Sequence, residues 1–151
     1  MKIEQALKMT TFSSPNHKAG LNILYTAWWL KTQVSKELKN FGLTHEQYNV
    51  LRILKGKHPE SICVKDIACR MIERNSNVPR IVDRLVAKEY VERSTSEIDK
   101  RETVIKLTDS GIEILLAANQ RVDKMFSNCV KLDDKEAVQV NDLLEKMREN
   151  E

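Results

Sequence analysis

The sequence predicts a mainly α-helical protein with a small β-wing. Along most of the chain, apolar residues recur every three to four positions, which is the spacing of amphipathic helices. Between residues 90 and 107, two β-prone runs flank a charged tip, as in a hairpin. The central order is helix, polar turn, helix and two-stranded ribbon, which is the order of a winged helix-turn-helix. We expect N- and C-terminal helices outside this unit to serve as dimerisation helices.

Length and composition favour one ordinary globular domain. The chain has 151 residues, of which 41% are hydrophobic and 31% charged, so residues 1–151 are expected to form a single unit with its own core. No window approaches the roughly 18 uncharged apolar residues of a membrane span, and the N-terminus is too polar for a signal peptide. We therefore expect a cytoplasmic protein without a membrane partner.

Charge is distributed unevenly along the chain. The net charge is only +3, but residues 107–151 carry ten acidic and six basic side chains. The basic excess therefore lies in residues 1–106, which is where a phosphate-binding surface is expected.

The three cysteines do not form a recognisable metal or disulfide pattern. Cys63, Cys69 and Cys129 are odd in number, and their spacing matches no zinc motif. We expect reduced thiols that pack as small buried or half-buried side chains, with no metal and no cofactor.

The first long helix is predicted at residues 14–39. Residues 1–13 form either a short helix or a loose arm. Ser14 is a good N-cap and Pro15 suits the first helical position, while Gly42 is placed for a left-handed residue after the helix. Further apolar residues fall outside the main stripe. A second apolar face is therefore expected, covered by another element or another chain.

The winged-helix lobe is predicted at residues 43–107. Its first helix begins with a capping box, in which Thr44 and Gln47 bond each other's backbone amides. A very short strand is expected at residues 62–63, followed directly by the next helix.

A polar turn at residues 74–77 precedes the helix that we expect to read DNA. Asn75, Ser76 and Asn77 are all candidate N-caps. We favour Ser76, because Pro79 then falls at the third helical position, where no intrahelical amide bond is lost.

This helix divides into an apolar face and a polar face. The inward positions are Val78, Ile81, Val82 and Leu85. The outward positions are Asn77, Arg80, Asp83, Arg84 and Lys88. Arginines at four-residue spacing suit the major groove, where Arg and Asn make bidentate contacts with base edges. The same pattern also fits an ordinary solvated face, and the adjacent ribbon is what favours DNA binding.

The ribbon strands are predicted at Tyr90–Arg93 and Thr103–Leu107. Between them, the tip Asp99-Lys100-Arg101 fits a wing whose arginine enters a narrow minor groove. Asp99 is placed to hold Arg101 extended by a charge-assisted bond. Considered alone, a charged hairpin tip is better explained by solubility.

Two further helices are predicted in residues 108–150. Thr108 precedes the first of them, and Gly111 in its first turn allows close packing. Asp133 and Glu136 form a variant capping box for the last one. Like the first long helix, these helices are more apolar than the lobe requires, so we expect them to form a dimer interface with their counterparts in a second copy.

Catalysis is poorly supported by the sequence. There is no phosphate-binding glycine loop, no nucleophile motif and no convincing carboxylate pair, so we expect no enzyme activity. The principal alternative is a winged helix that contacts proteins instead of DNA. Affinity for DNA with a steep salt dependence distinguishes the two functions.

Over roughly residues 20–150, the sequence resembles the MarR family of transcriptional regulators. The motifs that carry the resemblance are Leu43-Thr44-x-x-Gln47-Tyr48-x-Val50-Leu51, Asp66-Ile67-Ala68, Asn75-Ser76-Asn77-Val78-x-Arg80-Ile81-Val82-Asp83-Arg84-Leu85 and Asp99-Lys100-Arg101-x5-Leu107-Thr108-x-x-Gly111.

The resemblance implies a homodimer on a pseudo-palindromic double-stranded DNA operator, usually acting as a repressor. It assigns the turn and the recognition helix to DNA binding, the wing arginine to the minor groove, and neighbouring side chains to phosphate. The residues that receive these roles are Arg74, Asn75, Ser76, Asn77, Arg80, Arg84, Asp99, Lys100 and Arg101.

Many members of the family are released from DNA by a small phenolic or lipophilic effector bound between the dimer helices and the lobe. In this chain the aromatic residues Tyr25, Trp28 and Trp29 are the candidates for such a pocket, although aromatic residues at helical spacing are more often core. Pro79 departs from the polar residue common at its position. The chain also lacks the N-terminal cysteine of peroxide-sensing members, which argues against that type of oxidant sensing.

Overall fold

The computed structural model describes residues 1–149, so the predicted end of the C-terminal helical segment at residue 150 lies outside the described part. The helices are α1 (Ile3–Leu7), α2 (Pro15–Lys39), α3 (His45–Lys55), α4 (Val64–Arg70), α5 (Val78–Ala87), α6 (Asp109–Cys129) and α7 (Asp134–Lys146). The strands are β1 (Ile62–Cys63), β2 (Val91–Thr95) and β3 (Thr103–Leu107). The mainly helical fold with a small β-wing is therefore confirmed.

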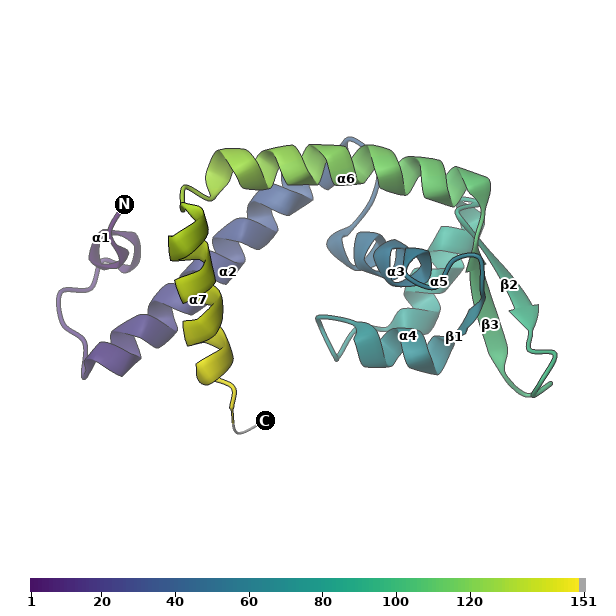
Figure 1. Ribbon diagram of the computed structural model, residues 1–151, viewed down its shortest axis with the longest axis horizontal. Coiled ribbons are helices and arrows are strands. Elements are labelled where there is room, and N and C mark those ends of the chain that lie inside the picture. The colour runs from purple at the N-terminus through teal and green to yellow at the C-terminus, as the bar shows by residue number, and fades with distance from the viewer. Residues whose placement is uncertain (150–151) are drawn as a thin grey trace.

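The molecule has a helical body and a winged lobe, joined by the long helix α6 (Figure 1). Helices α1, α2 and α7 lie on one side, and α3, α4, α5 and the sheet lie on the other. Helix α6 starts at the base of the wing, packs across α2 and leads into α7. The described helices include none that is long and apolar enough to cross a membrane.

Side-chain caps begin α2, α3 and α7 where the sequence predicts them. Ser14 Oγ accepts from the His17 amide, and Thr44 and Gln47 form the reciprocal capping box of α3. Asp133 and Glu136 do the same for α7. Local hydrogen bonds of this kind satisfy amides that a helix cannot satisfy itself, which is why they can be recognised in sequence.

Helix α5 is capped by Asn77, so the predicted Ser76 cap is wrong. The Oδ1 atom of Asn77 accepts from the Arg80 amide at 3.1 Å. Pro79 thus occupies the second helical position, where its missing N–H also costs no intrahelical bond. The proline therefore permits either cap, and it could not decide between them.

The sheet is antiparallel with strand order β1-β3-β2. Strand β2 starts one residue later than predicted, because Tyr90 still closes α5 by donating to Leu85 O. It also extends two residues further, where Ser94 and Thr95 pair with Val104 and Thr103. Pairing with β3 therefore overrides the weak β propensity of this polar segment.

One core holds the lobe against α2 and α6. Its side chains come from α2, α3, α4, α5, the sheet and α6. At the base of the wing, α6 approaches the backbone so closely that a Cβ on Gly111 would lie 2.0 Å from Tyr90 O. The close packing predicted at Gly111 is confirmed. The largest fully buried side chains include Leu38, Leu51, Leu54, Ile67, Leu85, Ile105 and Leu115.

The cysteines differ in exposure. Cys63 is half-buried and its Sγ accepts from the Asp66 amide, so it caps α4, and Cys129 is also half-buried. Cys69 lies exposed on α4, which contradicts its expected burial. Helix α4 is short and only one of its faces packs into the core, and Cys69 lies on the opposite face.

Candidate nucleic-acid interface

The outer face of α5 presents two arginines on a rigid support. Val78, Val82 and Leu85 are buried on the opposite face and fix the helix in the core. Arg80 and Arg84 are exposed, one turn apart. The predicted division of this helix is thus confirmed at these positions, and it gives two long donors on one surface.

Lys88 departs from the predicted outward face. It is half-buried, and its Nζ donates to Gly42 O and to Gln47 Oε1, the latter at 3.3 Å. Lys88 therefore ties the end of α5 to the start of α3. The sequence could not show this role, because the partners lie more than 40 residues away along the chain.

Two of the predicted DNA-binding side chains in the turn before α5 are not free on the surface, because one is buried and the other caps the helix. Ser76 Oγ is buried and has no hydrogen-bond partner within the described residues, so it does not face outward. The amide oxygen of Asn77 accepts the hydrogen bond that caps α5. One of the two lone pairs of this oxygen is therefore engaged, which constrains a bidentate contact with adenine, since that contact needs both the oxygen and the nitrogen of an Asn.

Arg74 and Asn75 lie at the exposed edge of the same turn. The Nη1 atom of Arg74 donates to Cys69 O at 2.7 Å, so the guanidinium folds back over the end of α4. Its remaining N–H groups can still reach a phosphate beside α5. Asn75 is exposed.

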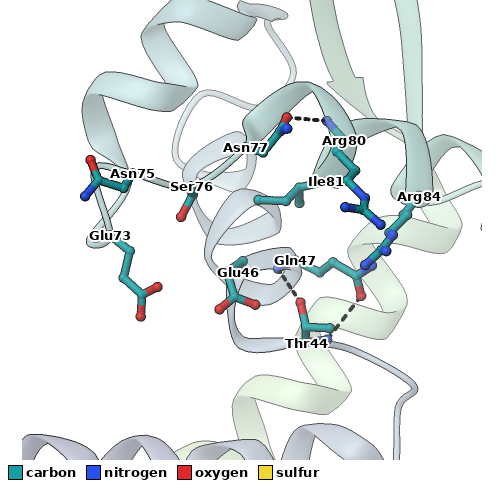
Figure 2. A pocket seen from close by; sticks show the side chains of 10 residues that line it. All are labelled: Thr44, Glu46, Gln47, Glu73, Asn75, Ser76, Asn77, Arg80, Ile81 and Arg84. Atoms are coloured by element: carbon teal, nitrogen blue, oxygen red, sulfur yellow. Dashed lines mark hydrogen bonds between the residues drawn. The ribbon is translucent and has the colours of Figure 1, made fainter.

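A polar cleft of about 370 Å³ separates the start of α3 from the start of α5 (Figure 2). Its walls carry carboxylates on one side and guanidinium groups on the other. The lining residues are Thr44, Glu46, Gln47, Glu73, Asn75, Ser76, Asn77, Arg80, Ile81 and Arg84. Burial raises the pKa of Glu46, but hydrogen bonds to the backbone and Thr44 and the charge of Lys31 outweigh it, so the pKa is lowered.

The wing tip is exposed and held by local hydrogen bonds. Ser96 Oγ accepts from the amides of Ile98 and Asp99. Asp99 Oδ1 accepts from the Arg101 amide at 2.9 Å. The charge-assisted bond of Asp99 therefore reaches the backbone amide of Arg101, and not the side chain that it was predicted to hold extended. The guanidinium of Arg101 remains exposed, as does Lys100.

Arg93 is a basic residue of this surface that the sequence analysis missed. It projects from β2 and forms an ion pair with Asp83 on α5. The bond joins the wing to the helix whose arginines face outward, and so it orients the two parts relative to each other. The available signal was the alternation of side chains along β2. Residues two apart lie on the same face of a strand, so Arg93 shares the face of buried Val91.

The predicted aromatic effector residues lie elsewhere, on α2. The rings of Tyr25 and Trp28 are 5.5 Å apart, and Trp28 is 60% exposed. An apolar groove of about 540 Å³ does lie along α2, but other residues line it, from the opposite face of that helix and from α7. Among the described residues, no group of three His, Cys, Asp or Glu side chains is arranged to hold a metal ion.

These groups can do one kind of chemistry, which is to donate hydrogen bonds and offer positive charge. Guanidinium and ammonium groups stand on an exposed helix and on a hairpin tip. Such groups match phosphates and the acceptor edges of bases in the two grooves of DNA.

Comparison with known proteins gives the same picture. The model of the MarR family matches residues 43–103. HTH-type transcriptional regulator YdcH of Bacillus subtilis is 33% identical over 116 residues, which cover 76% of this chain and 79% of YdcH. HTH-type transcriptional regulator MgrA of Staphylococcus aureus is 30% identical over 113 residues, 75% of each chain.

Solved structures resemble the whole fold. The S. aureus MepR–DNA complex has a TM-score of 0.76 at 26% identity and covers 85% of this chain and 94% of MepR. A mutant MarR from E. coli complexed with operator DNA has a TM-score of 0.75 at 25% identity and covers 85% of this chain and 91% of that MarR. Together with the winged lobe and its exposed arginines, these findings show that the chain belongs to the MarR family of transcriptional regulators and is not an enzyme.

Proposed function

We propose that the protein binds double-stranded DNA as a homodimer on a pseudo-palindromic operator and represses transcription from it. The carrying observation is the geometry of one surface: Arg80 and Arg84 on the outer face of α5, and Arg101 exposed on the adjacent wing. In this arrangement α5 enters the major groove and the wing enters the minor groove beside it. Arg74 and Lys100 contact phosphates.

Within the turn, we propose different DNA-binding roles from those that the resemblance implies. Because Asn77 caps α5 and Ser76 Oγ is buried, base discrimination rests mainly on Arg80 and Arg84. Asn75 contributes from the exposed edge of the turn, and Asn77 contributes mainly through the two N–H donors of its NH₂ group. Asp99 acts indirectly, since it fixes the backbone from which the wing arginine projects.

Apolar surface on the helical body supports the dimer. Helix α7 has no buried residue in the single chain, and Leu143 and Met147 are exposed to 63% and 60%. They line the apolar groove between α2 and α7, together with side chains such as Ile23 and Leu30. A groove of this character favours an interface with a second copy over contact with water.

Repression and its relief by a lipophilic effector complete the proposal. Residue Trp28 is 60% exposed, and with Tyr25 it forms an aromatic surface on α2. Rings of this kind can stack on the ring of a phenolic ligand. S. aureus MepR and E. coli MarR have been solved in complex with DNA, and this chain shares their fold over 85% of its length.

Selection of bound sequences from a random duplex pool tests the proposal. An inverted repeat with half-sites about one helical turn apart, roughly 10 base pairs, is the expected result for a symmetric dimer. Binding should also weaken steeply with salt, because each neutralised phosphate releases counterions. No enrichment at low salt by ligand-free protein would overturn the proposal and favour a winged helix that contacts proteins.

A further inference from the structure

Lys31 connects the helical body to the turn that precedes α5. It lies half-exposed on α2, and its Nζ donates to Glu73 Oε1 across 42 residues of sequence. The same Nζ lies 3.9 Å from Glu46 Oε1 in the first turn of α3. Figure 2 shows the carboxylates of Glu46 and Glu73 on the same side of the cleft, away from Asn77. One lysine thus meets two carboxylates from two segments of the lobe.

The turn that Lys31 reaches has little apolar packing of its own. Ile72 is 73% exposed, and the next three residues are exposed as well. Arg74 bonds back to α4, which ties the turn to its own lobe but not to α2. Among the described residues, the contact with Lys31 is therefore the side-chain bond that ties the exposed part of this turn to α2, while the shared core holds the rest of the lobe.

We propose that Lys31 is a positioning residue that sets the distance between the two α5 helices of the dimer. The inference rests on the proposed function, because it requires two lobes that bind one operator. Lys31 stands on a helix of the dimerisation body, and Glu73 stands four residues before the cap of α5. The ion pair fixes the start of α5 relative to α2, and in a symmetric dimer it does so twice.

The ion pair is too weak to contribute much to the stability of the fold, but it is suited to positioning. The side chains of Lys31 and Glu73 are 45% and 43% exposed, so solvent screens their attraction. The hydrogen bond with Glu73 raises the pKa of Lys31, so the ammonium group stays charged at neutral pH. Loss of the pair should leave the fold and the shared core intact while allowing the turn and the start of α5 a wider range of positions. That freedom must be given up on binding DNA, which lowers affinity.

The test compares operator duplexes whose half-site spacing is the selected one, one base pair shorter and one base pair longer. Lys31→Met should bind the selected spacing up to about fivefold more weakly, the factor that corresponds to about 1 kcal/mol. Its preference for that spacing over the other two should fall by a similar factor. Glu73→Gln should do the same. Base preference within each half-site should not change.

Further variants distinguish a positioning role of Lys31 from a general effect of its charge and from an effect on folding. Lys36→Met removes one charge from the same helix at an exposed site, so it should lower affinity equally for all three spacings. Lys31→Glu should behave worse than Lys31→Met, because it faces two carboxylates. Combining it with Glu73→Lys reverses the pair and should recover part of the spacing preference, which a purely structural loss would not.

The outcomes separate this inference from the proposed function. If the wild-type protein selects no inverted repeat, the proposed function fails and the inference fails with it. If wild type selects one but Lys31→Met keeps the wild-type spacing preference, Lys31 does not position the lobes. Failure of the reversed pair to recover any preference would also overturn the inference.

Discussion

At the scale of single residues, the wing shows how a backbone contact prepares a side chain for binding. Asp99 binds the amide of Arg101, and Ser96 binds two amides of the same tip. The loop is thus held before DNA arrives, which lowers the entropy that binding must overcome. Arg101 and its neighbour Lys100 are both exposed on this tip, and we propose that Arg101 enters the minor groove whereas Lys100 contacts a phosphate.

Arg101→Ala should weaken operator binding by about 1–3 kcal/mol and relax the preference for A·T pairs flanking each half-site. The reason is that a guanidinium in a narrow minor groove responds to groove shape. Lys100→Ala is the matched control, since a phosphate contact should lower affinity by a similar factor on all sequences. Binding titrations on flank variants measure both. Identical behaviour of the two variants would remove Arg101 from sequence recognition.

A second residue, His45, makes stability depend on pH. Burial lowers its pKa below 6.5 and the charge of Lys31 adds to this, while Glu46 and Glu73 act in the opposite direction. Because the folded pKa is depressed, the folded state opposes protonation. The stabilising contribution is present above about pH 6.5 and is lost as pH falls through the folded pKa.

His45→Gln should therefore reduce the loss of unfolding free energy between pH 7.5 and pH 5.5. Urea titrations of wild type and variant at several pH values measure that loss. His58→Gln is a suitable control, because His58 is exposed in a turn and should leave the curve unchanged. A His45→Gln curve parallel to wild type would show that His45 does not carry the dependence.

At the scale of elements, the junction of wing and α6 depends on one glycine. Gly111 lies in the first turn of α6, where Tyr90 O occupies the space of a side chain. Gly111→Ala should destabilise the fold by roughly 1–3 kcal/mol, because backbone must move to admit the methyl group. The gain in helix propensity, about 1 kcal/mol, does not offset a backbone clash.

Gly20→Ala provides the matched control, since Gly20 lies within α2 and no atom lies within 4 Å of its added Cβ. That variant should be neutral or more stable by roughly 0.5–1 kcal/mol. Urea denaturation of both variants gives the comparison. Equal stabilities for the two would contradict the close approach seen at Tyr90.

The same elements show what sequence can and cannot predict. Caps such as Thr44 and Asp133 were predictable because a helix start is a local event, settled by a side chain and an amide three residues away. Ser76 and Asn77 were not separable, because Pro79 tolerates both caps. The last residues of β2 depended on pairing with β3 and could not be read locally.

The candidate site divides in the same way. Exposure of Arg80 and Arg84 follows from helical periodicity and was predictable. The internal bonds of Arg74 and Lys88, and the link from Arg93 to Asp83, depend on where other segments lie. A pattern of charges therefore identifies the surface, whereas the partners of each charge require the fold.

At the scale of the whole molecule, DNA binding depends on a body that the single chain leaves incomplete. Helix α7 has no buried side chain, and an apolar groove stays open between it and α2. A second copy can cover this groove and bring two lobes into fixed relation. Affinity for the operator then exceeds that of one lobe, because the second half-site binds at a high effective concentration.

Leu143→Asp should disrupt this assembly, because it places a charge where the groove is apolar. The variant should sediment as a monomer at concentrations where wild type is a dimer. It should also lose most operator affinity while keeping its contacts with a single half-site. Asn141→Asp adds the same charge at an exposed position of α7 outside the groove lining and should preserve the dimer. If Leu143→Asp remained a dimer with full operator affinity, the interface would have to lie elsewhere on the helical body, and the distance between the lobes would be set by other helices.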